Sequence, residues 1–222
     1  METILVLKVS VLYLHRNLIF LAHKMKDKII AKATDMFLKL GFKSVTMDDI
    51  AGEMCISKKT IYKYFCNKEL LIAEGTTIVH EQIHQGINAI VEKNFNAIEE
   101  NFEIRKMFRE MFKSTDTSPV YQLKKHYPSI YETVISREIE ECISVFKQNT
   151  IKGIEQELYR KETDIDSFVK FYYTLIFNIN ETTKQESEVF KLEMKALEYH
   201  TRAIATPKGI TELQKQLENH IL

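Results

Sequence analysis

Residues 57–65 carry the types of side chain that bind nucleic-acid phosphates. The segment reads SKKTIYKYF, so three ammonium groups lie among several hydroxyl groups. Ammonium groups neutralise phosphates and release counterions, and hydroxyl groups hydrogen-bond to phosphates or base edges. Ile61 and Phe65 are four residues apart, so on a helix they share an inward face. The pattern predicts a short helix over residues 58–65 whose cationic side faces outward.

A second chemical pattern is His80-Glu81-Gln82-Ile83-His84, which has the H-E-x-x-H spacing. On a helix this spacing places two imidazoles on one face beside a carboxylate, as in zinc proteases. A third ligand would have to come from elsewhere, and the candidates are Glu99, Glu100 and Glu103. A protease also needs an open cleft edged by a strand, and the chain has no strand pattern. We therefore expect no enzyme, no metal and no cofactor. A metal-dependent hydrolase and a non-catalytic metal site remain alternatives.

The residues before the cationic segment predict two further helices. Apolar residues recur at helical spacing from Ile29 to Leu40, and Gly41 then indicates a C-cap in the left-handed region. Thr46 is a suitable N-cap for a helix of about two turns that starts with Asp48 and Asp49. Ser57 and Asn67 are N-caps of the cationic helix and of the helix that follows it.

Two short helices joined by a few residues, the second with a basic outer face, are typical of a helix-turn-helix. Residues 46–51 (TMDDIA), 56–65 (ISKKTIYKYF) and 67–71 (NKELL) follow one another here. In order and spacing they resemble the N-terminal DNA-binding domain of the tetracycline-repressor (TetR) family of bacterial regulators. One departure is the joint Met54-Cys55-Ile56-Ser57, where that family often has a glycine.

The resemblance implies a role for each matching residue. Thr46 would contact a phosphate, as would Lys63, Tyr64 and Lys68. The side chains that would face the major groove are Ser57, Lys58, Lys59, Thr60 and Tyr62. Lys43 is added because of its position beside the bound backbone. The implied protein is a cytoplasmic homodimeric repressor, without contact to a membrane, that binds a palindromic operator in double-stranded DNA and is released by an unknown small-molecule effector.

The rest of the chain predicts long helices and matches no further motif. The expected ranges are 67–92, 94–113, 120–127, 129–159, 166–180, 187–205 and 211–222. The fold class is therefore all-α, with an N-terminal three-helix helix-turn-helix domain and a larger C-terminal helical bundle. The family resemblance assigns dimerisation to 166–180 and 187–205. Candidate pocket residues are His84, Tyr121, His126, Tyr131 and Tyr173, and the effector-binding residues stay unknown.

Composition and charge agree with this interpretation. Six glycines and three prolines are too few for an all-β sandwich or a disordered linker. Three cysteines without a CxxC pair fit a reducing compartment. The whole chain has 31 basic and 31 acidic residues, but residues 25–70 have nine basic and six acidic ones. A basic front on an acidic body predicts that the front meets a polyanion.

The first 24 residues form an apolar run interrupted by Lys8 and Arg16. Each central cation costs roughly 2.5–3.5 kcal/mol in a membrane span, so a stable span is not expected. Ala22-His23-Lys24 is also a poor signal-peptide cleavage site. We expect residues 1–24 to be an extension that is either untranslated, with Met25 as the true start, or dispensable; the alternative is a membrane-associated helix. The predicted domains are 25–70 for DNA binding and 71–222 for dimerisation and effector binding.

Two further alternatives concern function. The chain could be a helical ligand-binding or interaction protein with a vestigial DNA-binding domain. Cys55 and Cys66 flank the cationic helix, so a thiol-sensing regulator is conceivable, although small residues that fill a packed joint explain them more simply.

Overall fold

The computed structural model describes residues 24–219, apart from the side chains of residues 137 and 138. The predicted extension therefore lies outside the described residues, except for residue 24. All regular elements of the described chain are helices; among these residues there is no strand, only two isolated bridges, Thr117–Gln185 and Tyr159–Ala205. The all-α prediction is confirmed. None of the described helices combines the length and apolar character that crossing a membrane requires.

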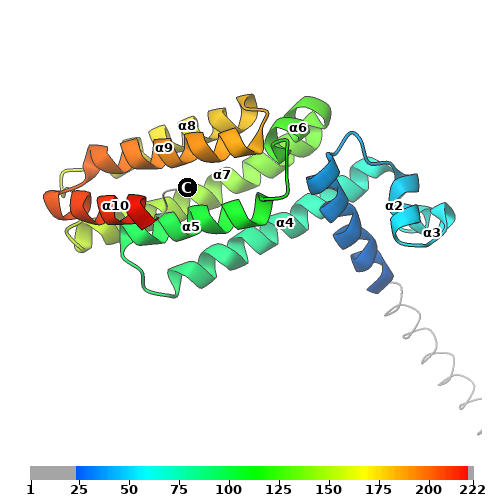
Figure 1. Ribbon diagram of the computed structural model, residues 1–222, viewed down its shortest axis with the longest axis horizontal. Coiled ribbons are helices and arrows are strands. Elements are labelled where there is room, and N and C mark those ends of the chain that lie inside the picture. The colour runs from blue at the N-terminus through cyan, green and yellow to red at the C-terminus, as the bar shows by residue number, and fades with distance from the viewer. Residues whose placement is uncertain (1–23, 220–222) are drawn as a thin grey trace, which may run out of the picture.

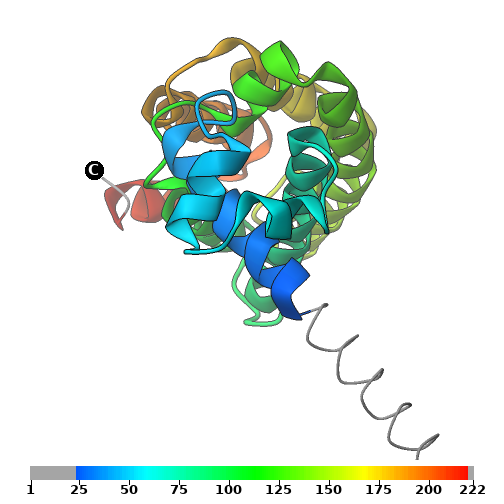
Figure 2. The ribbon, with the colours of Figure 1, turned by 90° about the vertical axis from the view of Figure 1, so that its right-hand side faces the viewer.

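Three helices form the small N-terminal unit at one end of the molecule (Figures 1 and 2). They are the helix of residues 24–40, α2 (Met47–Glu53) and α3 (Lys58–Tyr62). Gly41 ends the first helix at φ +91°, and a Cβ there would lie 2.9 Å from Gln122 Oε1, so both backbone and space favour glycine. Leu40, the last residue of the apolar pattern, is 62% exposed.

The helix α3 is shorter than the predicted 58–65. The N–H groups of Tyr64 and Phe65 both donate to Ile61 O, at 2.9 and 3.0 Å, and this tightens the end of the helix into a turn. Phe65 nevertheless reaches the core, as predicted. The buried cluster comprises Ile29, Ile30, Ala33, Met36, Phe37, Phe42, Val45, Met47, Ile50, Ala51, Ile61, Phe65, Leu71, Ile72 and Leu123. Full burial of Ile61 or Phe65 contributes about 1.5–3 kcal/mol each.

The helix α4 (Lys68–Val91) leaves this unit and runs along the C-terminal bundle (Figure 1). The remaining helices are α5 (Ala97–Phe112), α6 (Pro119–His126), α7 (Pro128–Glu155), α8 (Ile165–Thr182), α9 (Glu186–Ile204) and α10 (Pro207–Asn219). Because α4 contributes Leu71 to the first buried cluster and Ile87 to another, the predicted boundary between residues 70 and 71 falls inside one continuous helix.

Two further helix ends differ from the prediction. The helix α7 stops at Glu155 rather than near 159, because Glu157 adopts φ 59° and Tyr159 then pairs with Ala205. The helix α10 starts at Pro207 rather than at 211. Proline suits the first turn of a helix because it lacks the N–H that would be unsatisfied there.

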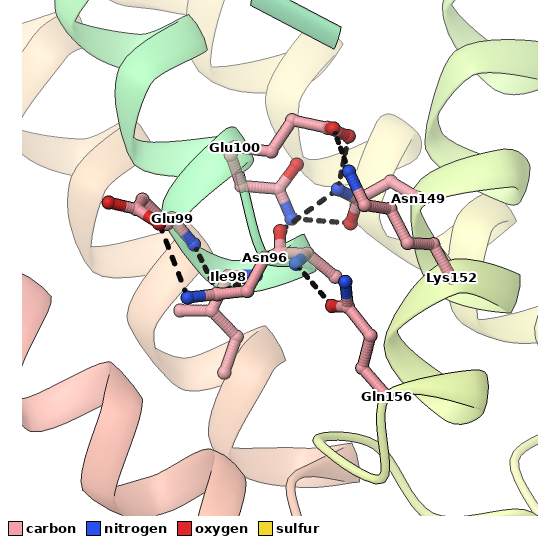
Figure 3. A network of polar contacts seen from close by, with 9 residues as sticks. Asn96, Ile98, Glu99, Glu100, Asn149, Lys152 and Gln156 are labelled. Atoms are coloured by element: carbon pink, nitrogen blue, oxygen red, sulfur yellow. Dashed lines mark hydrogen bonds and ion pairs between the residues drawn. The ribbon is translucent and has the colours of Figure 1, made fainter. Parts of the chain in front are cut away.

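A polar network ties the start of α5 to α7 (Figure 3). The buried Asn149 amide donates to Ala97 O at 2.9 Å and to Glu100 Oε1 at 2.7 Å. Lys152 Nζ donates to Glu100 Oε2 at 2.6 Å, and Gln156 Oε1 accepts from Ala97 N at 2.8 Å. These bonds satisfy polar groups that the bundle buries, so they fix the register of the two helices.

The short helix α6 attaches the bundle to the N-terminal unit at Phe42. Phe42 N donates to Gln122 Oε1 at 2.9 Å, and the Tyr127 hydroxyl donates to Phe42 O at 3.3 Å. Leu123 completes the attachment by packing in the N-terminal core. A shift of α6 would therefore displace Phe42 and its neighbour Lys43.

The turn between α2 and α3 contains strain that a mutation can remove. Cys55 has φ 53° and is exposed, so a Cβ sits in the left-handed region with little packing in return. We expect Cys55→Gly to raise the free energy of unfolding by about 0.5–1 kcal/mol in urea titration, with an unchanged m-value. Cys55→Ala is the control, because alanine keeps the Cβ and should bring no gain; a Cys55→Gly protein less stable than Cys55→Ala would contradict this account.

Candidate functional site

The outer face of α3 is cationic and exposed. Ser57, Lys58, Lys59, Tyr62 and Lys63 are exposed, whereas Thr60 and Tyr64 are half-buried. The same helix turns Ile61 into the core, where it is fully buried. The orientation predicted for this segment is thus the one in the structure. Figure 2, viewed from the end that carries the N-terminal unit, shows α2 and α3 at the surface.

Lys58 links α3 to α2. Its Nζ lies 2.7 Å from Asp48 Oδ1, and its hydrogen bond to Asp48 raises the pKa of Lys58. The ammonium also lies 5.9 Å from the centre of the Tyr62 ring. A phosphate that approached Lys58 would have to compete with the carboxylate of Asp48.

Thr46 caps α2 through a capping box with Asp49. Thr46 Oγ1 accepts from Asp49 N at 3.1 Å and donates to Asp49 Oδ2 at 2.7 Å, and Thr46 N donates to the same carboxylate at 2.8 Å. The hydrogen bonds from the Thr46 hydroxyl and backbone lower the pKa of Asp49. The hydroxyl proton of Thr46 is therefore already used, and a phosphate contact through it requires a change of partner.

Lys68 is half-buried beside the exposed Lys43. Its Nζ donates to Lys43 O at 3.3 Å and lies 5.8 Å from the Phe37 ring centre and 5.9 Å from that of Tyr127. Burial lowers the pKa of Lys68, although Glu69 and Asp49 oppose the shift. The sequence did not predict the role of Tyr127, because it lies 59 positions from Lys68 and no local pattern indicates that its ring covers this lysine.

The bundle contains a cavity of about 530 Å³ with mostly apolar walls. Its wall extends from Phe42 in the N-terminal unit to Tyr173 and Ile176 on α8. Of the five predicted pocket residues, Tyr173 lines it, and its hydroxyl donates to Cys142 O at 2.8 Å. The sequence missed most other lining residues, because an apolar helical position does not reveal whether it meets a neighbour or a void.

A buried ion pair crosses this cavity wall. Arg105 Nη1 on α5 lies 2.7 Å from Glu193 Oε2 on α9, and Asn180 Nδ2 donates to Glu193 Oε1 at 2.7 Å. Burial disfavours the charge of the guanidinium, but the adjacent Glu193 carboxylate outweighs it and holds the pKa of Arg105 above its usual value. Removing one partner of such a pair leaves an uncompensated charge, which costs about 3–5 kcal/mol.

Glu186 is an acidic residue of the cavity wall whose buried carboxyl oxygen, Oε2, has no hydrogen-bond partner among the described residues. Burial, aided by repulsion from Glu193, raises the pKa of Glu186 to about 7. This wall therefore offers a carboxyl group that changes its charge near neutral pH.

The H-E-x-x-H residues lie in the middle of α4, and none of the three candidate acidic ligands belongs to the group that the two histidines form. Glu100 is committed to Lys152 and Asn149. The carboxylate beside the two imidazoles is instead Glu141 of α7. Glu81, the carboxylate within the motif, is exposed on α4.

Comparisons with known proteins agree with this geometry. Residues 29–74 match the model of the bacterial regulatory proteins, tetR family. The biofilm operon icaADBC negative transcriptional regulator IcaR of Staphylococcus epidermidis is 23% identical over 148 residues, which are 67% of this chain and 69% of that protein.

The fold recurs in solved structures. A transcriptional regulator from Cytophaga hutchinsonii has a TM-score of 0.64 at 18% identity, over 81% of this chain and 98% of the other. A putative regulator from Saccharomonospora viridis, in complex with choline, has a TM-score of 0.64 at 16% identity, over 83% and 99%.

A helix-turn-helix unit joined by a continuous helix to an all-α bundle defines the class: a DNA-binding transcriptional regulator. In its DNA-binding part the chain is similar to the tetR family of bacterial regulatory proteins.

Glu186 predicts how stability depends on pH. Below about pH 4.5 the carboxyl group is protonated in both the folded and the unfolded protein. Between pH 4.5 and 7 it ionises only in the unfolded protein, so its destabilising effect on the fold grows up to pH 7 and is complete above it. We expect the free energy of unfolding of Glu186→Gln to be about 1–3 kcal/mol higher than that of wild type at pH 8, and equal to it near pH 4.5, in denaturant titrations.

The matched control is Glu188→Gln, because Glu188 is exposed in the same first turn of α9. Its removal tests the contribution of the helix dipole alone. Equal pH profiles for the two variants would show that burial of Glu186 is not the cause.

Proposed function

We propose that the chain is a cytoplasmic, dimeric repressor that binds a palindromic operator and is released by a small-molecule effector. The observation that carries the proposal is the exposed cationic face of α3 above a fully buried Ile61. A short helix presented in this way can enter a major groove about 12 Å wide. The resemblance to IcaR, a negative transcriptional regulator, supports repression.

The proposed DNA contacts divide into two kinds. Exposed Lys59 and Lys63 are positioned to meet the duplex directly, whereas Lys58 and Lys68 first have to leave Asp48 and Lys43 O. The full proposed set is Lys43, Thr46, Ser57, Lys58, Lys59, Thr60, Tyr62, Lys63, Tyr64 and Lys68.

The outer faces of α8 and α9 support a homodimer. Large apolar side chains point to solvent there: Phe171 and Tyr199 are each 66% exposed, and Leu175 and Leu192 are 45% and 40% exposed. Phe171 and Leu175 are one helical turn apart, as required for a continuous stripe. A two-fold dimer buries such a stripe against its own copy and places two recognition helices on one palindrome.

The cavity supports effector control. Its wall includes Phe42, whose backbone is bonded to Gln122 and Tyr127. A ligand that rearranged this wall would move Lys43 and Lys68 relative to the bundle. The similarly folded S. viridis regulator, in complex with choline, supports this use of the fold.

Exposed lysines of α3 should control DNA affinity. We expect Lys63→Ala to weaken binding to all duplexes alike and to reduce the slope of log K against log salt by about 1, because a phosphate contact is lost. Lys59→Ala should weaken operator binding more than binding to random duplex. Footprinting on DNA beside the protein's own gene supplies the operator, and fluorescence anisotropy measures affinity.

Lys93→Ala is the control, since Lys93 is exposed just beyond the opposite end of α4. The wild type showing no preference among duplexes, even in dilute salt, would overturn the proposal in favour of a ligand-binding protein with a vestigial DNA-binding domain.

The α8–α9 face should control assembly. We expect Leu175→Arg with Leu192→Arg to convert the dimer to a monomer in analytical ultracentrifugation and to weaken operator binding, because each protomer would place two charges in the interface. Val91→Arg, at a residue 41% exposed on α4, should leave the dimer intact. A monomeric wild type at micromolar concentration would contradict the dimer.

A further inference from the structure

Three potential metal ligands meet between α4 and α7. His80 and His84 lie one turn apart on α4, and Glu141 approaches them from α7. The ligand atoms of the three residues all lie within 4.8 Å of one another. The two imidazoles are 12% and 19% exposed, with ring centres 4.4 Å apart, so the pair is held in place by its surroundings.

The spacing fits one shared ion. Two atoms that each lie about 2.0–2.1 Å from a tetrahedral Zn²⁺ are separated by roughly 3.3 Å. Here His80 Nε2 lies 3.7 Å from Glu141 Oε1, and His84 Nε2 lies 3.0 Å from Glu141 Oε2. The two distances end on different oxygens of the Glu141 carboxylate and lie on either side of the required value. The three side chains are thus close to the spacing of one ion and would have to rotate to share it.

We propose that His80, His84 and Glu141 bind a late first-row divalent metal ion, Zn²⁺ foremost, which clamps α4 to α7. Two imidazole nitrogens and one carboxylate oxygen are a donor set that favours Zn²⁺ over Mg²⁺ or Ca²⁺, which prefer oxygen ligands. Three protein ligands leave one position of a tetrahedral ion for water or another ligand. His80 also lines the cavity, so this position is near the proposed effector site.

The clamp has a consequence for regulation that rests on the proposed function. The first turn of α4 carries Lys68 and packs Leu71 and Ile72 into the N-terminal core, so α4 moves with the DNA-binding unit. Fixing the middle of α4 to α7 therefore restricts the positions that this unit can take against the bundle. Metal binding is expected to change operator affinity through this restriction.

The site is tested first without DNA. Tag-free, full-length protein, freed of metal by a chelator and dialysed, is titrated with ZnCl₂ in a calorimeter, and with CoCl₂ to record the visible bands of bound Co²⁺. We expect one ion per chain, micromolar or tighter affinity for Zn²⁺, and none for Mg²⁺. Zn²⁺ should also raise the melting temperature, because the three ligands are assembled only in the fold.

Variants identify the ligands. His84→Ala and Glu141→Gln should each weaken Zn²⁺ binding by about 100-fold or more, since outer-shell partners alone are worth about 10–100-fold. Glu140→Gln and Glu81→Gln are matched controls on the same two helices, both exposed, and should bind as wild type. No binding at micromolar Zn²⁺, or binding unaffected by both ligand variants, overturns the site.

Operator affinity is then compared with and without Zn²⁺. We expect a change of several-fold in wild type that is absent in Glu141→Gln, whose metal-free affinity should be unaltered. If Zn²⁺ binds through the three residues and operator affinity stays the same, the regulatory role is overturned while the metal site stands. If no DNA is bound at all, the proposed function fails, and the calorimetric result still decides the metal site.

Discussion

The continuity of α4 is the constraint on which the rest of the molecule depends. One helix caps itself at Asn67, packs Leu71 into the N-terminal core, and then packs Ile83 and Ile87 into the bundle. A continuous helix transmits rotation and translation because its backbone hydrogen bonds cannot yield singly at low cost. The attachment of α6 to Phe42 makes the position of the DNA-binding unit depend on contacts other than α4 as well.

The proposed DNA-binding face is organised before any duplex arrives. Asp48 holds Lys58, and the rings of Phe37 and Tyr127 lie beneath Lys68, so these cations have defined positions. Exposed ion pairs contribute little to stability, so a phosphate can displace Asp48 from Lys58 at small cost. The half-buried Lys68 is different, because it is packed against the segment that α6 holds, and its position therefore reports on the bundle.

The bundle interior contains both buried polar groups that are hydrogen-bonded and one that is not. The Asn149–Glu100–Lys152 network satisfies its buried groups, whereas Glu186 keeps a buried oxygen without a partner beside a cavity. An uncompensated group beside a void destabilises the protein alone and becomes favourable when a ligand supplies the missing partner. This contrast agrees with a bundle that is rigid near the start of α5 and adaptable around the cavity.

Local patterns in the sequence determined the helices, the caps at Thr46, Ser57 and Asn67, and the outward face of α3, because each depends on residues within one or two turns. The tertiary structure alone decided what depends on distant partners. Glu141 rather than Glu99, Glu100 or Glu103 meets the histidines, and Tyr127 covers Lys68. Phe171 and Leu175 face solvent, whereas Tyr172 and Ile176 of the same helix are buried. Helical periodicity shows which residues share a face, whereas the packing of separate helices decides which neighbour, cavity or solvent that face meets.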